Sequence, residues 1–143
     1  MCVVQMRPQF HAVRLCLLWK FWTLAKTETA YQNPNLFEGA APVSGGGSGI
    51  TASNFTHTKI VGAVGTRDAD GYEYNMTWAV QQIKHNTSMT PRLIKYQGAT
   101  HDTITASINY SALFGCLFND NCDVSFDGAY NGNTVKATVY FGD

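Results

Sequence analysis

The segment from Lys59 to Gly65, Lys-Ile-Val-Gly-Ala-Val-Gly, limits the possible folds more than any other part of the sequence. Its apolar residues do not alternate with polar ones, which is typical of a parallel strand covered on both faces. Apolar residues then recur at the spacing of one helical face, at Tyr72, Met76, Ala79, Val80 and Ile83. We therefore expect a buried strand, a loop, and a helix that packs back over the sheet.

The same order of elements recurs further along the chain. A strand is expected at 92–97, where the apolar residues are Leu93, Ile94 and Tyr96 and Pro91 suits the start of the strand. A helix is then expected from about Thr103 to Phe118, marked by Ile104, Ile108, Ala112 and Cys116. Strand, helix, strand, helix is the order that gives a parallel sheet with flanking helices, so the predicted fold class is α/β.

The flanking segments predict three parts. Residues 1–31 form an atypical N-terminal helical segment, with a helix expected from about Val13 to Tyr31 that ends before Pro34. Residues 32–118 form the α/β part, which begins with a short strand from Leu36 to Ser44 and a flexible glycine-rich connection. Residues 119–143 form a C-terminal β-hairpin extension.

The hairpin is predicted from alternating polarity on both sides of Asn131-Gly132. This dipeptide favours the tight turn of a two-stranded hairpin. The expected strands lie within Asp123 to Tyr130 and Thr134 to Phe141.

Composition excludes several classes of partner. The 143 residues are 45% hydrophobic, enough for one domain that buries roughly 70% of its unfolded surface. The formal net charge is zero, so no overall field attracts nucleic acid or an anionic membrane. Every apolar run is shorter than the roughly 18 residues of a transmembrane helix. The start of the chain is also a poor match to a signal peptide, because its apolar region is too short.

Cysteines and sequons bear on the compartment. Cys116 and Cys122 are close enough in sequence for a local disulfide, although two free thiols remain an open alternative. The sequence has four Asn-x-Ser/Thr sequons, at Asn54, Asn75, Asn86 and Asn109. Their number favours a secreted glycoprotein.

Two loops carry the residues with the clearest chemical potential. Asp68 follows the strand 59–65, and His101 follows the strand 92–97 after a turn at Gly98. The carboxyl ends of parallel strands meet at one edge of the sheet, where open α/β sheets place ligands. A carboxylate there would fix the imidazole tautomer and stabilise its protonated form. The alternative is a loop histidine bonded to Asp102 or to backbone.

Other catalytic arrangements are less well supported by the sequence. An acyl-transfer triad also needs a nucleophile, but no serine lies in the Gly-x-Ser-x-Gly pattern of a nucleophile elbow. Ser44 and Ser48 come nearest, and both fail it. His57, His85 and His101 do not share the spacing of metal ligands, so neither a metal nor a cofactor is expected.

Three motifs resemble one family. The segment 33–46, Asn-Pro-Asn-Leu-Phe-Glu-Gly-Ala-Ala-Pro-Val-Ser-Gly-Gly, resembles the segment after the nucleophile helix in secreted α/β-hydrolase esterases of the feruloyl-esterase and polyhydroxybutyrate-depolymerase type. Gly65-Thr66-Arg67-Asp68 is similar to their acid loop, and Gly98-Ala99-Thr100-His101 is similar to their histidine loop. The resemblance covers roughly residues 24–115.

The resemblance implies that Asp68 is the triad acid, with Asp70 as the alternative acid, and that His101 is the general base. It implies the C-terminal half of an α/β-hydrolase sheet, a small-molecule or polymer-linked ester as substrate, and an extracellular parent protein. It also places the nucleophile serine upstream of residue 1. The chain would then be a truncated, misassembled or alternatively started product that hydrolyses esters poorly by itself.

Two further expectations follow. In the strand order of the family, the segment near Glu38 to Val43 would neighbour the nucleophile strand, so it should form an uncovered edge that promotes self-association unless the N-terminal helix masks it. The alternative function is a non-catalytic α/β binding module that uses the glycine-rich loop and the C-terminal hairpin as contact surfaces.

Overall fold

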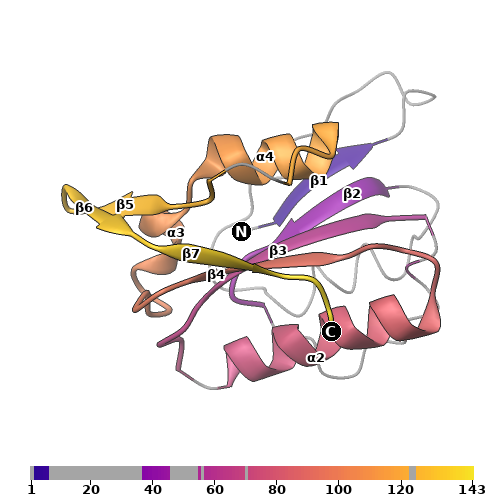
Figure 1. Cartoon of the computed structure of the whole chain (residues 1–143), viewed down its shortest axis with the longest axis horizontal. Helices are drawn as coiled ribbons and strands as arrows, with labels where there is room; N and C mark the ends of the chain where they lie inside the picture. The colour runs from indigo at the N-terminus through magenta and orange to yellow at the C-terminus, as the bar shows by residue number, and fades with distance from the viewer. Residues whose placement is uncertain (1, 7–36, 46–54, 56, 70, 123–124) are drawn as a thin grey trace.

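The chain forms a mixed α/β sheet with helices on both faces, seen in a computed structural model that describes residues 2–6, 37–45, 55, 57–69, 71–122 and 125–143 (Figure 1). The main sheet has five strands in the order β1-β2-β3-β4-β7. Their bounds are β1 Cys2–Met6, β2 Phe37–Pro42, β3 Lys59–Gly65, β4 Arg92–Tyr96 and β7 Ala137–Tyr140. Strands β2, β3 and β4 are parallel, and the two outer strands run antiparallel to them.

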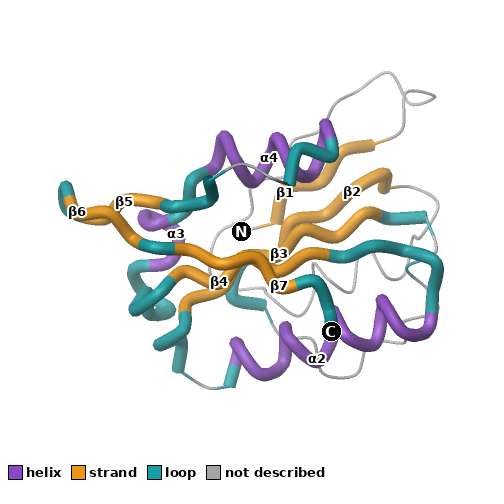
Figure 2. The backbone as a smooth tube through the Cα atoms, viewed as in Figure 1, coloured by secondary structure: helices purple, strands orange, loops and turns teal. Residues whose placement is uncertain are grey.

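Strand β3 is the centre of the sheet, as its continuous apolar sequence predicts. Every residue of β3 after Lys59 is buried. Helix α2, Tyr72–Asn86, covers one face, while α3, Ile104–Ser107, and α4, Tyr110–Asn119, lie on the other (Figures 1 and 2). The pleat of β4 divides its side chains between two clusters, with Leu93 packed in the α2 cluster and Ile94 in the cluster that includes α4.

The prediction for α2 is confirmed. Met76, Ala79, Val80 and Ile83 are buried, and Tyr72 at the start of the helix is partly buried. These residues form the expected apolar face, and Met76 and Val80 pack with Val64 and Leu93 of the sheet. Burial against the sheet therefore stabilises this helix, whose opposite face carries exposed residues such as Tyr74.

The single helix expected from Thr103 to Phe118 is wrong, because the chain breaks between α3 and α4 at Ile108 and Asn109. The Asn109 side chain accepts a hydrogen bond from the Ala112 N–H at 3.1 Å, so it caps a new helix. The N–H of Asn109 donates to the Tyr96 hydroxyl at 3.1 Å and not to a carbonyl in the preceding turn. Both bonds favour two helices over one.

The C-terminal hairpin is present, but its second strand is shorter than predicted. Strand β5, Gly128–Tyr130, pairs antiparallel with β6, Asn133–Val135. Asn131 and Gly132 form the turn with positive φ angles of 50° and 77°. After Lys136 the chain enters the main sheet as β7 and pairs with β4, so Thr134 to Phe141 is not one hairpin strand.

The expectation of an uncovered edge near Glu38 to Val43 is wrong. Strand β1 pairs antiparallel with β2 along Phe37–Pro42, while β3 pairs with β2 on the other side. The backbone groups that were expected to be free therefore have a partner strand. The predicted helix from Val13 to Tyr31 lies outside the described residues. Among the described residues, no helix is long and apolar enough to cross a bilayer.

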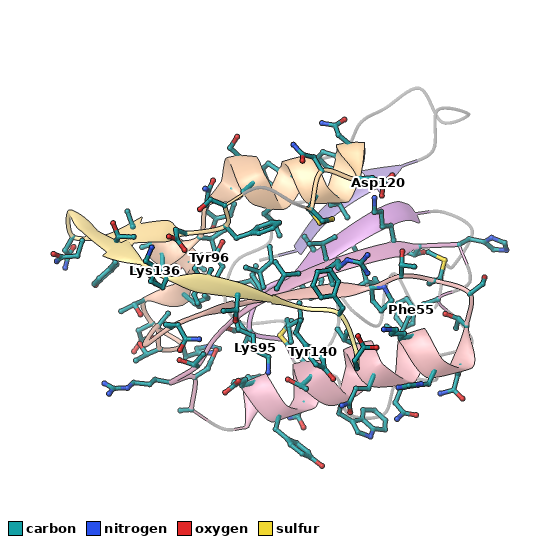
Figure 3. The ribbon with its side chains drawn as sticks, in the orientation of Figure 1. Phe55, Lys95, Tyr96, Asp120, Lys136 and Tyr140 are labelled. Carbon is teal, nitrogen blue, oxygen red and sulfur yellow. A yellow bond between two sulfur atoms is a disulfide. The ribbon has the colours of Figure 1, made fainter. Side chains whose placement is uncertain are left out.

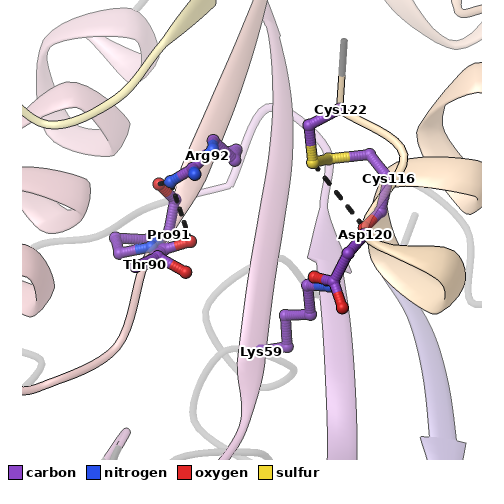
Figure 4. Close-up of polar contacts among 7 residues, drawn as sticks. All are labelled: Lys59, Thr90, Pro91, Arg92, Cys116, Asp120 and Cys122. Atoms are coloured by element: carbon purple, nitrogen blue, oxygen red, sulfur yellow. Dashed lines mark hydrogen bonds and ion pairs between the residues drawn. A yellow bond between two sulfur atoms is a disulfide. The ribbon is translucent and has the colours of Figure 1, made fainter. Parts of the chain in front are cut away.

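A disulfide closes the end of α4. Cys116, buried in this helix, is bonded to Cys122, six residues later. Asp120, between them, has a positive φ of 56°, and its carboxylate forms an ion pair with Lys59 at the start of β3 (Figure 4). The predicted pairing of Cys116 and Cys122 is present, and it fixes the chain where it leaves the helix.

Breaking this disulfide is expected to lower the free energy of unfolding by about 2 kcal/mol, the loop-closure value for so short a loop. The measurement is urea denaturation with and without dithiothreitol. Cys122→Ser is the control, because it should unfold at the same urea concentration in both conditions. An unchanged midpoint for the native sequence after reduction would contradict this prediction.

Candidate acid–base site at the carboxyl end of the sheet

The acid loop begins where β3 ends. The N–H of Asp68 donates to the Gly65 carbonyl at 3.1 Å, which forms a tight turn directly after the strand. This turn directs Asp68 back into the protein, and its side chain is completely buried. A short loop between a buried strand and α2 therefore places a carboxylate at the edge of the sheet.

The histidine loop follows β4 and turns at Gly98, whose φ of 74° suits glycine, as the sequence predicts. The N–H groups of Thr103 and Ile104 both donate to the Thr100 carbonyl, and the Thr103 hydroxyl accepts from the Thr100 N–H at 2.9 Å. His101 lies within this hydrogen-bonded turn at the start of α3. Its position is thus fixed by local backbone bonds.

Hydrogen bonds join the two loops directly. The Thr66 N–H donates to the Tyr96 carbonyl and the Arg67 N–H to the Ala99 carbonyl, both at 3.0 Å. In the opposite direction, the Gly98 N–H donates to the Thr66 hydroxyl at 2.8 Å. These bonds continue the pairing of β3 and β4 beyond the strands. They hold the acid loop and the histidine loop in one register.

Asp68 and His101 meet between the loops. Asp68 Oδ1 lies 3.0 Å from His101 Nδ1. An ionised carboxylate only accepts hydrogen bonds, so the proton of the neutral imidazole belongs on Nδ1, and Nε2 carries the lone pair. The His101 side chain is 30% exposed, so the acid is buried and the imidazole can reach solvent or a ligand.

Tyr72 completes the immediate surroundings of the histidine. Its ring stacks on the imidazole, with the ring centroids 4.9 Å apart and the planes inclined by 24°. The sequence assigned Tyr72 only to the apolar face of α2, since its spacing is that of a core residue. Its position in the first turn after the acid loop was the signal that could have placed it beside Asp68.

The second oxygen of Asp68 has a different environment. Oδ2 is buried and has no hydrogen-bond partner in the part of the chain that the structure describes. A carboxylate in such a place is usually satisfied on both oxygens, because an unpaired buried acceptor costs free energy. The buried carboxylate of Asp68 therefore relies on its bond to His101 for hydrogen bonding.

The serine candidates do not join this pair. Ser44 lies just beyond β2 with a positive φ of 45°, and its N–H donates to the Ala63 carbonyl at 2.9 Å. Its hydroxyl is buried and, among the described residues, has no hydrogen-bond partner, so it is not bonded to His101. Ser48 and the alternative acid, Asp70, lie outside the described residues.

Tyr96 supports the histidine loop from within the core. Its side chain is fully buried between the sheet and the α3–α4 segment (Figure 3), and its hydroxyl accepts the Asn109 N–H. Burial raises the pKa of the phenol to about 12.

On the same strand, Lys95 forms an ion pair with Glu73 at 3.1 Å and lies over the Tyr140 ring. Both contacts hold β4 beneath the site.

Within the described residues, no three His, Cys, Asp or Glu side chains gather as they would around a metal ion. His57 and His85 are exposed, and the histidine bonded to Asp68 is His101. The chain matches no protein-family model, no curated protein and no solved structure.

Proposed function

We propose that Asp68 and His101 are the acid and base of a serine carboxylic-ester hydrolase whose nucleophile serine lies outside this chain. The observation that carries the proposal is the 3.0 Å contact between Asp68 Oδ1 and His101 Nδ1 at the carboxyl ends of adjacent parallel strands. The motifs 33–46, 65–68 and 98–101 give the ester class, either a small-molecule ester or a polymer-linked one.

The proposed chemistry is acyl transfer. With Nδ1–H held by Asp68, the Nε2 lone pair of His101 accepts the proton of a serine hydroxyl as that oxygen attacks the ester carbonyl. The protonated imidazole then donates the proton to the departing alcohol. Water then attacks the acyl-enzyme while Nε2 accepts its proton, the bond between the acyl carbon and the serine oxygen breaks to release the carboxylic acid, and the imidazolium returns the proton to the serine oxygen. Burial of Asp68 beside the imidazole stabilises the charged form of His101 during each step.

The disulfide between Cys116 and Cys122 supports an oxidising compartment, and the parent protein is proposed to be extracellular. No cofactor takes part in the proposed reaction. Because β1 covers β2, the edges of the main sheet that are available for self-association among the described strands are those of β1 and β7.

The full chain is expected to hydrolyse p-nitrophenyl acetate without saturable turnover, because losing one triad member costs several orders of magnitude in rate. His101→Asn is the matched control, and its rate should equal that of the unaltered chain. Efficient turnover that a serine-reactive phosphonate abolishes would contradict the proposal. Ser44→Ala would then show whether the strained serine after β2 is the nucleophile.

The transcript that encodes the chain gives an independent test of the ester-hydrolase assignment. Read upstream of Met1 in every frame, it is expected to encode Gly-x-Ser-x-Gly between a strand and a helix. If it encodes no such elbow, the assignment fails.

The alternative is a non-catalytic binding module. It is favoured by the observation that, in the described part of the chain, the Ser44 hydroxyl has no hydrogen bond to His101.

A further inference from the structure

Three of the four sequons lie in described segments, and the structure gives each asparagine a different environment. Asn75 lies inside α2, Asn86 is the last residue of the same helix, and Asn109 lies between α3 and α4. Asn54 lies outside the described residues. The motif is the same at every position, so the fold must distinguish the sites that can carry a sugar.

Asn109 uses its side chain within the fold. Its oxygen caps α4 by accepting the Ala112 N–H, and its Nδ2 donates to the Asp127 carbonyl at 3.2 Å. The residue is only partly exposed. A glycan on Nδ2 would occupy the space between α4 and the segment before β5. Modification at Asn109 therefore competes with the contacts that separate α3 from α4.

Asn75 is unfavourable for a different reason. It lies in the first turns of α2, with its N–H bonded to the Gly71 carbonyl, and it is partly buried. The hydroxyl of its sequon belongs to Thr77 and donates to the Glu73 carbonyl at 2.7 Å. Both the asparagine and the hydroxyl residue are thus held in helical geometry.

Asn86 is less restricted than either of these asparagines. It is exposed at the C-terminal end of α2, and its Nδ2 bonds are to Gln82 of the same helix, at 2.9 Å to the carbonyl and 3.3 Å to the side-chain oxygen. The next residue, Thr87, is extended, and Ser88 is exposed. Water can replace the bonds of Nδ2 on the surface, so a sugar can be added without moving any core residue.

We propose that Asn86 is an N-glycosylation site of the folded protein, and that Asn75 and Asn109 are not. In the transfer, Nδ2 loses a proton to a base of the transferase and forms a bond to the anomeric carbon of the sugar. The bond from that carbon to the diphosphate of a lipid-linked or nucleotide-linked donor breaks, and the diphosphate leaves with the electron pair. This inference does not depend on the proposed hydrolase function.

The first test uses the full chain behind a cleavable secretion signal in a eukaryotic cell, with Asn54→Gln in every variant. Peptide mapping of the secreted protein is expected to find a glycan on Asn86 alone. Ser88→Ala removes the sequon without altering Asn86 and should abolish the glycan. Ser111→Ala is its matched control at the Asn109 sequon and should leave the glycan in place. A secreted product with Asn86 unmodified, or with Asn75 or Asn109 modified, overturns the proposal.

The second test does not require secretion. Purified chain is incubated with a soluble asparagine N-glycosyltransferase and UDP-glucose, before and after reduction and unfolding. In the native chain, Asn86 should be modified at least about tenfold faster than Asn109, because Asn109 must first be released by local unfolding. After unfolding, the difference should disappear. Equal rates at Asn86 and Asn109 in the native chain overturn the proposal.

Discussion

Gly65→Ala is expected to lower the free energy of unfolding by about 3 kcal/mol, the upper part of the usual range for overpacking. A β-carbon at this position would lie 2.1 Å from the carbonyl oxygen of Ala99 and 2.6 Å from its carbonyl carbon. Both atoms belong to backbone, so no side chain can turn away to make room. The end of β3 would have to separate from the loop after β4.

The same separation should damage the candidate site. The Arg67 N–H is bonded to the Ala99 carbonyl that the new methyl group would displace. Asp68 is the next residue, and its contact with His101 depends on the register of the two loops. We therefore expect Gly65→Ala to weaken the Asp68–His101 bond as well as the fold.

The measurement combines urea denaturation with ¹⁵N spectra of the imidazole. The native chain should show one tautomer with the proton on Nδ1, and Gly65→Ala should show a mixture. Gly115→Ala is the matched control, because among the described residues nothing apart from the helix's own nearby backbone lies within 4 Å of the added carbon in α4, where alanine should stabilise by up to about 1 kcal/mol. A Gly65→Ala protein as stable as the native one would refute the close approach of the two loops.

Local sequence pattern predicted the parts of the fold that depend on neighbouring residues. The uninterrupted apolar run 59–65 and the helical spacing from Tyr72 to Ile83 correspond to β3 and α2. The hairpin turn at Asn131-Gly132 also follows from its own residues. In each case the segment carries the signal that decides its conformation, so the prediction needed no knowledge of distant contacts.

Distant contacts decided the parts that were predicted incorrectly. The helix break at Asn109 depends on the hydroxyl of Tyr96, which is 13 residues away. The cover over β2 comes from β1, whose pairing partner is more than thirty residues later in the sequence. Periodicity within one segment contains no information about either contact, although asparagine is a common helix cap and could have suggested the start of α4.

The candidate site was predictable only in part, because strand order indicates which loops meet but not how the loops pack in three dimensions. Strand order brings the loops after β3 and β4 to one edge, so the meeting of Asp68 and His101 followed from the sequence. Their catalytic role stays a prediction. The stacking of Tyr72 on His101 and the positive φ of Ser44 were not predicted, because both depend on how the loops pack in three dimensions.

Tyr96→Phe is expected to destabilise the protein at neutral pH and to remove much of its sensitivity to alkali. At neutral pH, loss of the hydroxyl leaves the Asn109 N–H without its acceptor, which should cost about 1–2 kcal/mol. The ring itself stays in the core, so no cavity of side-chain size forms.

The alkaline effect has the opposite sign. The pKa of Tyr96 is raised from 10.0 to about 12 in the folded protein, chiefly because burial disfavours the phenolate. Between these two pH values the unfolded chain releases the proton and the folded chain keeps it, so stability falls as the pH rises. A difference of two pKa units corresponds to roughly 3 kcal/mol, most of which is lost by pH 12 and the rest just above it.

The stability curves of the native chain and Tyr96→Phe should therefore cross between pH 10 and pH 12, measured by denaturant unfolding at a series of pH values. Tyr110, whose pKa burial also raises, is present in both proteins and affects both curves alike. Tyr130→Phe, in the exposed hairpin, is the control and should follow the native curve throughout. If the native chain and Tyr96→Phe instead lose stability in parallel above pH 10, the hydroxyl of Tyr96 is not buried, and its hydrogen bond with the Asn109 N–H must be abandoned.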